Sequence, residues 1–177
     1  LPSVDGVPLT DITTVFEDRE GNVWLGKEGG GLLLLRPKNV RVLAAATGFP
    51  TDMTQCVVQD AGGAVWLGTW DEGLLRLTPG DPLHPVPVRI AADVTSVYSL
   101  LSARDGSLFI GTWGKGLYRR KGAVTTTIVD RIVTPFTSII SVAEDPRGTV
   151  WIGTAHDGVL EKNGTSSRVW NDSTGLS

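Results

Sequence analysis

The sequence predicts an all-β fold built from one repeated unit, and three observations lead to this prediction. The chain has 22 glycines and 10 prolines among 177 residues. No window shows the sustained 3.6-residue hydrophobic period and end signals of a helix, while residues that favour strands are plentiful. The stretch GAVWLGTWDEGL, with three glycines and two tryptophans, has equivalents along the whole chain. We therefore expect short strands joined by tight turns.

Four copies of this stretch are present, and they begin at Gly21, Gly63, Gly106 and Gly148, with offsets of 42, 43 and 42 residues. A strand-like run such as TDITTVFED precedes each copy. A turn and a β-rich run follow it, beginning at Val40, Pro87, Thr125 and Ser167. Four strands in a period of about 40–45 residues are typical of a propeller blade. We predict a β-propeller segment over residues 1–177 with four antiparallel four-stranded blades, approximately at 8–50, 51–92, 93–134 and 135–177.

The recurring residues of each copy have structural roles. The first glycine, for example Gly21, closes the turn after the first strand, behind a turn-forming aspartate. The middle glycine, for example Gly68, lies within the second strand, where a missing side chain permits close approach of a neighbouring backbone. The bulky residue of the second strand is expected to fill the space between adjacent blades. That position holds Trp24, Trp66, Phe109 and Trp151.

The best copy, EDREGNVWLGKEGGGL, resembles the repeat of two-component regulator propellers. The resemblance covers nearly all of the chain and rests on an Asp-x-x-Gly-x-x-Trp-x-Gly-Thr core. The third copy departs from this core with Ala103 and Phe109, and the first copy has Lys27 in place of threonine. Such repeats commonly build seven-bladed propellers in the sensor regions of bacterial hybrid histidine kinases. The resemblance therefore implies a role in signal transduction and a periplasmic or extracytoplasmic location.

Composition argues against several classes of partner and cofactor. The net charge is −3 and the 16 basic residues are scattered, so we expect no nucleic acid partner. No apolar run approaches the roughly 18 residues of a membrane span, so no membrane contact is expected within this chain. The single cysteine, Cys56, and two histidines, His84 and His156 in predicted turns or loops, offer no metal cluster. We expect no metal and no cofactor.

Two motifs that suggest chemistry have a simpler explanation. Gly21 to Lys27 has the glycine spacing of a phosphate-binding loop, but Glu28 stands where that loop needs serine or threonine. The other copies repeat the spacing without the lysine. Cys56 aligns with small residues of the other first strands and lacks a nearby base, so a buried structural thiol is expected.

The recurrent carboxylates also favour structure over catalysis. They precede a turn glycine by three residues, which is typical of backbone capping. They are Asp18, Asp60 and Asp145. We expect no catalytic residues, and the prediction is that the chain is not an enzyme.

Positions that vary between copies are the candidates for ligand recognition. One set lies in the turn between the second and third strands, and the other in the first strand. Because neighbouring strands are antiparallel, both sets belong to one face of the blades. The predicted ligand-binding residues are Trp70, Asp71, Tyr98, Trp113, Lys115, His156 and Asp157. On the sequence alone, Trp70 and Trp113 either form an aromatic platform or fill the gap between blades.

The predicted function is that of a non-catalytic sensor or ligand-binding propeller of a bacterial two-component-type signalling protein, with an unknown small-molecule or glycan ligand. One alternative is a lyase or hydrolase on a propeller scaffold, for which His156 beside Asp157 offers the only start. Another is a pure protein-interaction or dimerisation scaffold. Four blades leave two open flanks, so we expect two chains to associate and complete the propeller, with a tight four-bladed ring as the alternative.

Overall fold

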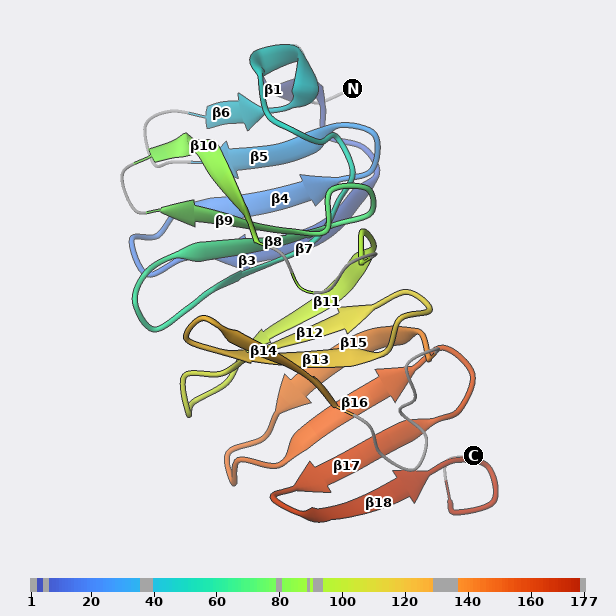
Figure 1. The fold of residues 1–177 in the computed structure, drawn as a ribbon. Helices are drawn as coiled ribbons and strands as arrows, with labels where there is room; N and C mark the ends of the chain where they lie inside the picture. The colour runs from blue at the N-terminus through green and yellow to red at the C-terminus, as the bar shows by residue number, and fades with distance from the viewer. Residues whose placement is uncertain are drawn as a thin grey trace. The chain divides into compact units, whose positions relative to one another are not determined.

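The computed structural model describes residues 3–4, 7–35, 40–78, 81–88, 90, 94–128 and 137–175. The chain divides into two compact units, unit 1 (Leu1–Ser96) and unit 2 (Val97–Ser177). Each unit holds two four-stranded antiparallel sheets whose strands neighbour one another in chain order (Figure 1). This arrangement confirms the predicted all-β fold with four-stranded propeller blades. No helix in the described part of the chain is long and apolar enough to cross a membrane.

Unit 1 contains blades 1 and 2. Blade 1 consists of β3 (Ile12–Glu17), β4 (Val23–Lys27), β5 (Gly31–Leu35) and β6 (Val40–Leu43). Blade 2 consists of β7 (Thr54–Gln59), β8 (Val65–Thr69), β9 (Leu74–Thr78) and β10 (Asp81–Val88). A small sheet of β1 (Ser3–Val4) and β2 (Val7–Pro8) precedes blade 1, and the 3-10 helix η1 (Ala45–Thr47) follows it.

Unit 2 contains blades 3 and 4. Blade 3 consists of β11 (Val97–Ser102), β12 (Leu108–Thr112), β13 (Leu117–Lys121) and β14 (Val124–Ile128). Blade 4 consists of β15 (Ile139–Glu144), β16 (Val150–Thr154), β17 (Val159–Asn163) and β18 (Ser166–Trp170).

The fourth strand of blade 2 is longer than the sequence predicts. The prediction begins it at Pro87 and leaves His84 in a turn or loop, whereas β10 starts at Asp81 and includes His84. The strand is the outer one of its sheet, and its register shifts between Asp81 and Val86. Proline has no N–H for a strand ladder, and an irregular edge strand is where it is tolerated. The three prolines of β10 are the reason that the sequence pattern did not predict the whole strand.

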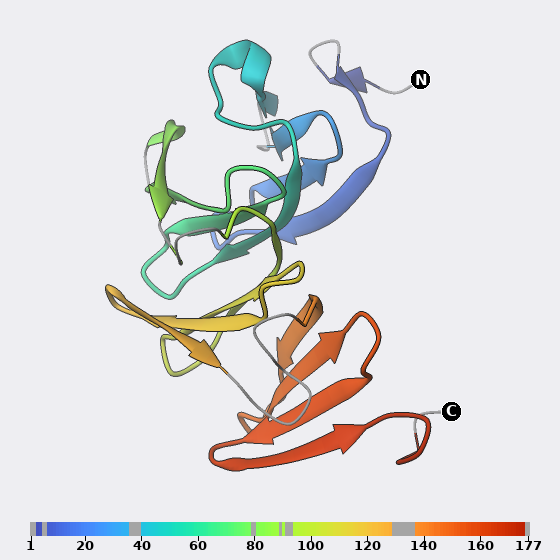
Figure 2. The same cartoon turned by 45° about the vertical axis from the view of Figure 1, so that its right-hand side comes forward.

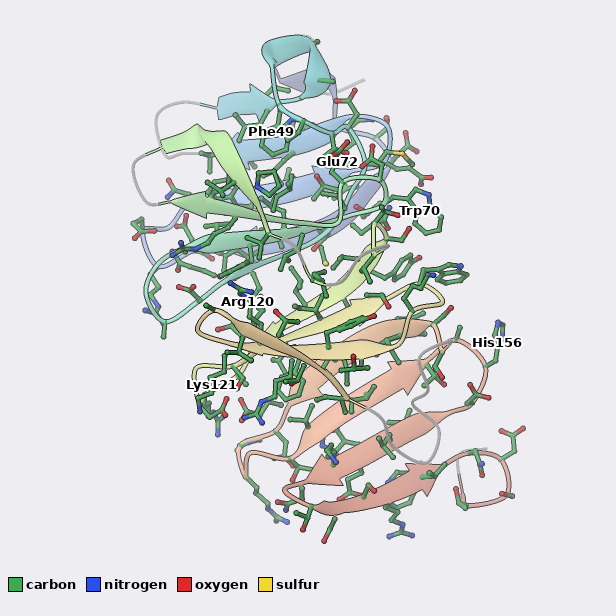
Figure 3. The ribbon with its side chains drawn as sticks, in the orientation of Figure 1. Phe49, Trp70, Glu72, Arg120, Lys121 and His156 are labelled. Carbon is green, nitrogen blue, oxygen red and sulfur yellow. The ribbon has the colours of Figure 1, made fainter. Side chains whose placement is uncertain are left out.

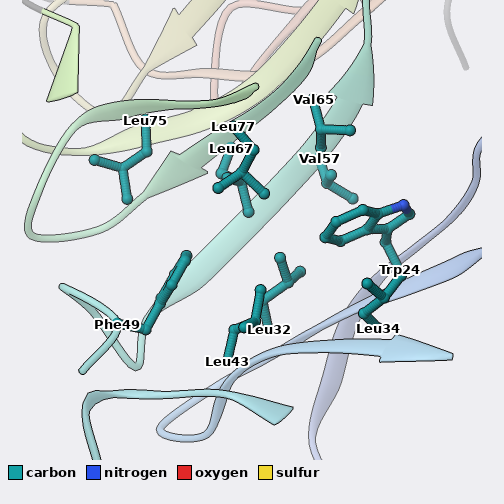
Figure 4. Close-up of a cluster of buried hydrophobic side chains, with 10 residues drawn as sticks. All are labelled: Trp24, Leu32, Leu34, Leu43, Phe49, Val57, Val65, Leu67, Leu75 and Leu77. Carbon is teal, nitrogen blue, oxygen red and sulfur yellow. The ribbon is translucent and has the colours of Figure 1, made fainter. Parts of the chain in front are cut away.

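The core of unit 1 lies between its two blades (Figure 4). Trp24 of β4 is only 4% exposed, and its ring lies across from Val57 and Val65 of blade 2. Alternate residues of each strand point to the same side of a sheet, so one face of each blade supplies the cluster. Its members are Trp24, Leu32, Leu34, Leu43, Phe49, Val57, Val65, Leu67, Leu75 and Leu77.

The core of unit 2 is equivalent and lies between blades 3 and 4. Its buried members are Ala103, Phe109, Leu117, Ile139, Val150, Ile152 and Leu160. Phe109 takes the place that Trp24 has in unit 1, and Trp66 is also buried, as predicted. Trp151 is only half-buried, because it lies on the face of β16 opposite Val150 and Ile152, which pack against blade 3.

Within each unit the first strand of the second blade packs closely on the blade before it. β7 contacts β3 and β4, and β15 contacts β11 and β12 (Figure 2). The middle glycine makes room for this contact: a Cβ on Gly26 would lie 2.5 Å from Cγ2 of Thr14 and 3.3 Å from the carbonyl oxygen of Thr54. The sequence predicts close approach of a neighbouring backbone, and the Thr54 carbonyl group confirms it, but a second group was not predicted. The nearest group is a side chain of the same blade, since Thr14 faces Gly26 across the ladder.

An aspartate after the first strand holds both the following turn and the tryptophan. Oδ1 of Asp18 accepts hydrogen bonds from the backbone N–H groups of Glu20 (3.0 Å) and Asn22 (2.8 Å). Its Oδ2 accepts one from Nε1 of Trp24 at 2.8 Å. Burial raises the pKa of Asp18, but the hydrogen bonds from Trp24 and Asn22 outweigh it and hold the pKa below the usual value. Asp18 is therefore a structural carboxylate, as predicted.

The same arrangement recurs in blades 2 and 4. Asp60 caps its turn and accepts a hydrogen bond from Nε1 of Trp66 at 2.8 Å. Asp145 caps the turn of blade 4, and the backbone N–H of Thr149 is the main cause of its lowered pKa. The bond to the indole was not predicted, and it explains why aspartate and tryptophan occur together.

Blade 3 lacks both residues of this pair. Phe109 has no ring N–H, so Ala103 leaves no donor unsatisfied. The turn is held instead by Asp105, whose Oδ1 accepts the backbone N–H of Ser107 at 2.9 Å. Arg119 donates to Asp105 and to Oγ of Ser107. The two departures of the third copy from the repeat are therefore linked, because a ring without an N–H at Phe109 needs no acceptor at Ala103.

An arginine joins the turns of the two blades in unit 1. The backbone N–H of Arg19 donates to Oε1 of Gln59 at 3.2 Å, and its Nη1 donates to the carbonyl oxygen of Ala61 at 3.2 Å. Both acceptors lie in or beside the first turn of blade 2.

Arg104 makes the equivalent contacts in unit 2. Its backbone N–H donates to Oε2 of Glu144 at 2.9 Å, and its Nη1 donates to the carbonyl oxygen of Pro146 at 2.7 Å. At this position the second and fourth copies carry Ala61 and Pro146, whose side chains have no donor. The arginines thus join blade 1 to blade 2 and blade 3 to blade 4. Each of these contacts lies within one unit.

Candidate ligand-recognition face

A β-bulge interrupts the first strand of every blade. The register shifts between Ile12 and Thr14, between Thr54 and Cys56, between Val97 and Ser99, and between Ile139 and Ser141. The bulged residues are Thr13, Gln55, Tyr98 and Ile140, which is the set that varies between copies. Bulges redirect side chains and are frequent beside functional sites. The sequence identified these positions by their variation, and the bulge is the structural reason that they are set apart.

The variable turn residue of each blade lies at the same edge as the bulge. The backbone N–H groups of Glu28, Trp70 and Ala155 donate to the carbonyl oxygens of Asp11, Met53 and Ser138, each at 3.0 Å. These carbonyl groups lie two residues before the bulged residue of the same blade. We call this edge of each blade, with its bulge and its turn between second and third strands, the variable edge.

The threonine of the repeat fixes the shape of this turn. Oγ1 of Thr112 donates to the carbonyl oxygen of Gly116 at 2.6 Å, and Thr154 and Gly158 form the same bond at 2.8 Å. Gly158 has φ of 88°, and a Cβ there would collide with the carbonyl group of Trp170. The turn backbone is therefore held rigidly while its variable side chains are presented to solvent.

Tyr98 and Trp113 form an aromatic pair at the variable edge of blade 3. Their ring centroids lie 5.4 Å apart with an interplanar angle of 42°. Trp113 is 43% exposed and Tyr98 is half-buried. The backbone N–H of Gly114 donates to Oγ of Ser138 at 2.9 Å, which ties the turn to blade 4. The structure thus brings two of the predicted site residues together on a supported turn.

Trp70 occupies the equivalent turn of blade 2 and is 37% exposed (Figure 3). Its carbonyl oxygen accepts a hydrogen bond from Oγ of Ser96 at 2.8 Å. Asp71 is engaged locally, since its Oδ1 accepts from Oγ1 of Thr51 at 2.6 Å and from the backbone N–H of Glu72 at 3.0 Å. Trp70 belongs to unit 1 and Trp113 to unit 2, so a shared platform stays a prediction.

The remaining predicted residues lie in unit 2. Lys115 is half-buried in the turn that carries Trp113. His156 and Asp157 are exposed in the turn between β16 and β17, and Figure 3 shows His156 at the end of unit 2 opposite Lys121. The backbone N–H of Asp157 donates to Oγ1 of Thr154 at 2.8 Å. Five of the seven predicted residues therefore belong to the variable edges of one unit.

The described residues hold little else that suggests catalysis. No three side chains of the metal-binding types His, Cys, Asp and Glu gather closely enough there to hold an ion. Burial raises the pKa of the Cys56 thiol to about 12, so the reactive thiolate is scarce at neutral pH. Cys56 faces Gly68 across the ladder, in the role that Thr14 has opposite Gly26. Cys56 is half-buried and not fully buried as predicted, and its structural role stays a prediction.

Solved structures share this fold. The extracellular domain of a proposed hybrid two-component system from B. thetaiotaomicron matches 96% of this chain with a TM-score of 0.76 and 20% identity. That of a proposed one-component system from the same organism matches 99% with a TM-score of 0.78 and 22% identity. The chain spans about a quarter of each, 24% of their length.

A virginiamycin B lyase from Staphylococcus aureus matches 94% of the chain and 57% of its own length, with a TM-score of 0.72 and 11% identity. No curated protein sequence matches this chain. The family model of the two-component regulator propeller matches residues 6–26 and 135–156, which include the aspartate and tryptophan of the first and fourth copies. Two segments of this chain therefore match the repeat of the two-component regulator propeller family, as their Asp-x-x-Gly-x-x-Trp core predicts.

Proposed function

We propose that this chain is part of the non-catalytic sensor region of a bacterial two-component-type signalling protein and recognises a ligand outside the cytoplasm. The observation that carries the proposal is the pair of half-buried Tyr98 and exposed Trp113 at the variable edge of blade 3. The repeat family and the shared fold with extracellular domains of signalling systems support the class of protein.

The aromatic pair suits recognition for physical reasons. Tyrosine and tryptophan offer large contact areas and lose little conformational entropy on binding. Trp113 is held on a turn that is closed by Thr112 and tied to blade 4 through Gly114, so the pair is preorganised. His156 and Asp157 of the neighbouring blade add polar groups for orientation. A small molecule or glycan with a flat apolar face and a polar rim fits this combination.

The test is a thermal-shift screen of defined oligosaccharides and small polar metabolites, followed by titration of any ligand found. Trp113→Ala and Tyr98→Ala should each weaken binding by about tenfold or more, because each removes one of the two rings of the pair. Val124→Ala is the matched control, since Val124 is an exposed apolar residue at the opposite end of unit 2. A ligand that binds the Trp113→Ala variant as tightly as the parent would place recognition elsewhere.

The same screen separates the sensor from the enzyme alternative. Mass spectrometry of each bound ligand should show no chemical change over hours of incubation. Turnover that is lost in His156→Ala would favour a lyase or hydrolase, because His156 is the exposed histidine of the variable edge of blade 4.

Self-association to complete the propeller is a further part of the proposal. Trp151 and Trp170 of blade 4 are both half-buried within the chain, and a second copy would cover them further. Light scattering at micromolar protein should give the mass of a dimer. A monomer that is stable to dilution would contradict this part and leave ligand recognition untouched.

A further inference from the structure

A pocket of about 160 Å³ lies between blades 3 and 4, and the predicted site residues take no part in it. It lies at the ends of the blades away from the variable edge, since Asp105 and Gly164 belong to the first and third turns of their blades. Its apolar wall includes Ala103, Phe109, Ile128 and Val150, and its charged wall includes Asp105, Arg119, Glu144 and Lys162.

Unit 1 shows what normally fills this space. Phe109, Arg119 and Lys162 correspond to Trp24, Leu34 and Leu77, which lie 85 residues earlier. These three unit 1 residues are 4%, 0% and 2% exposed and belong to the closed core. Unit 2 thus has a smaller ring and two cationic side chains where unit 1 has a larger ring and two leucines. The exchange opens a pocket with both apolar and charged walls.

The charged wall has hydrogen-bonding capacity left over. Arg119 uses Nη2 and Nε on Asp105 and Ser107, and its Nη1 has no hydrogen-bond partner among the described residues. Glu144 uses Oε2 on the backbone N–H of Arg104, and its Oε1 has no hydrogen-bond partner there. One wall therefore offers a cationic donor from blade 3 and a carboxylate acceptor from blade 4.

We propose that this pocket binds a small zwitterion, an α-amino acid with an apolar side chain. Its carboxylate would pair with Arg119, whose guanidinium suits carboxylates, and its ammonium group with Glu144. Its side chain would lie against Phe109 and Val150. A cavity of about 150 Å³ accommodates a benzene-sized molecule, so the side chain of phenylalanine or leucine matches the volume. This site is independent of the aromatic pair at the variable edge.

The probe is L-phenylalanine, added to the full chain up to about millimolar concentration. Binding is measured from chemical-shift changes in ¹H–¹⁵N spectra. Backbone signals around Ala103, Phe109 and Val150 should shift, with saturation. N-acetyl-L-phenylalanine amide, which has the same side chain and neither charge, should not bind. Equal binding of the two compounds, or no shift with L-phenylalanine or L-leucine, would overturn the proposal.

Two variants locate the site. Phe109→Trp combined with Ala103→Asp restores both the ring and the acceptor found in unit 1, so this double variant should abolish binding while leaving the fold intact. Glu144→Gln introduces the residue that unit 1 has at Gln59 and keeps an oxygen for Arg104, so it should lower affinity at least about tenfold through the lost charge. Trp113→Ala should bind L-phenylalanine as the parent does. Loss of binding in Trp113→Ala with no loss in the Ala103→Asp/Phe109→Trp double variant would assign the probe to the variable edge and refute the pocket.

Discussion

Units 1 and 2 are built from equivalent strands 85 residues apart, yet their blades meet through different interfaces. In unit 1, Trp24 is bonded to Asp18 and packs in a closed apolar core. In unit 2, Phe109 and Ala103 replace that pair, and charged groups border a pocket beside the core. The arginine contacts between blades are the same in both. An interface between blades can therefore keep its arginine hydrogen bonds while the residues packed inside it change, provided that the aspartate and the tryptophan are replaced together.

The largest loss of stability is expected from removing the Trp24 side chain, which packs in the core of unit 1. Trp24→Ala should lower the free energy of unfolding by about 3–5 kcal/mol, because the side chain is fully buried and leaves a cavity. Trp151→Ala should cost clearly less, since Trp151 is half-buried. Urea denaturation followed by circular dichroism measures both. Equal losses would mean that Trp151 is covered as Trp24 is, for example by a second chain.

The coupling between aspartate and tryptophan is the next test of the comparison. Asp18→Ala should cost about 1–3 kcal/mol, because it leaves the buried indole N–H of Trp24 without an acceptor. Trp24→Phe removes that donor, so adding Asp18→Ala to it should cost less than Asp18→Ala alone. The double-mutant cycle should give an interaction of about 0.5–3 kcal/mol. Additive losses would show that the co-occurrence of the two residues has another cause.

Removing the arginine hydrogen bonds between blades should lower the free energy of unfolding by a smaller amount, and by the same amount in both units. Arg19→Met and Arg104→Met keep the apolar stem and remove the donors to the turn of the next blade. Each should cost about 0.5–1.5 kcal/mol, the usual contribution of a hydrogen bond of this kind. Amide hydrogen exchange in the turns that contain Ala61 and Pro146 should rise in the matching variant. A loss confined to one unit would break the equivalence of the two joints.

The smallest difference concerns pH. The pKa of Asp18 in the folded chain is lowered, so its stabilising effect is complete above the unfolded value of about 3.9 and is lost as the pH falls below it. Asp18→Asn should reduce the loss of stability between about pH 5 and pH 3. Asp105 has a lowered pKa as well, because bonds from Ser107 and Arg119 outweigh its burial, and Asp105→Asn is the matched variant of unit 2. An unchanged pH profile in both variants would contradict these assignments.

The sequence by itself determined the repeat, and with it most of the strands, the turns and the bulky aromatic position, which is buried in blades 1, 2 and 3. Local patterning is sufficient for these features, because a strand alternates its faces every two residues and a turn needs glycine at a fixed place. The same pattern predicted that Tyr98 and Trp113 share an edge, and their rings are indeed in contact. It failed for β10, where three prolines concealed an edge strand.

Only the tertiary structure decided what lies between the blades. The bond from Trp24 to Asp18 joins neighbouring strands of a blade, and the arginine joints and the pocket combine residues of two blades about 40 residues apart. The sequence shows that Ala103 and Phe109 depart from the repeat. Their consequences depend on the space between blades 3 and 4 and on the absence of an indole N–H that would need an acceptor, and neither can be read from a single strand. Packing and hydrogen-bond satisfaction are properties of facing surfaces, so they become defined when the blades meet.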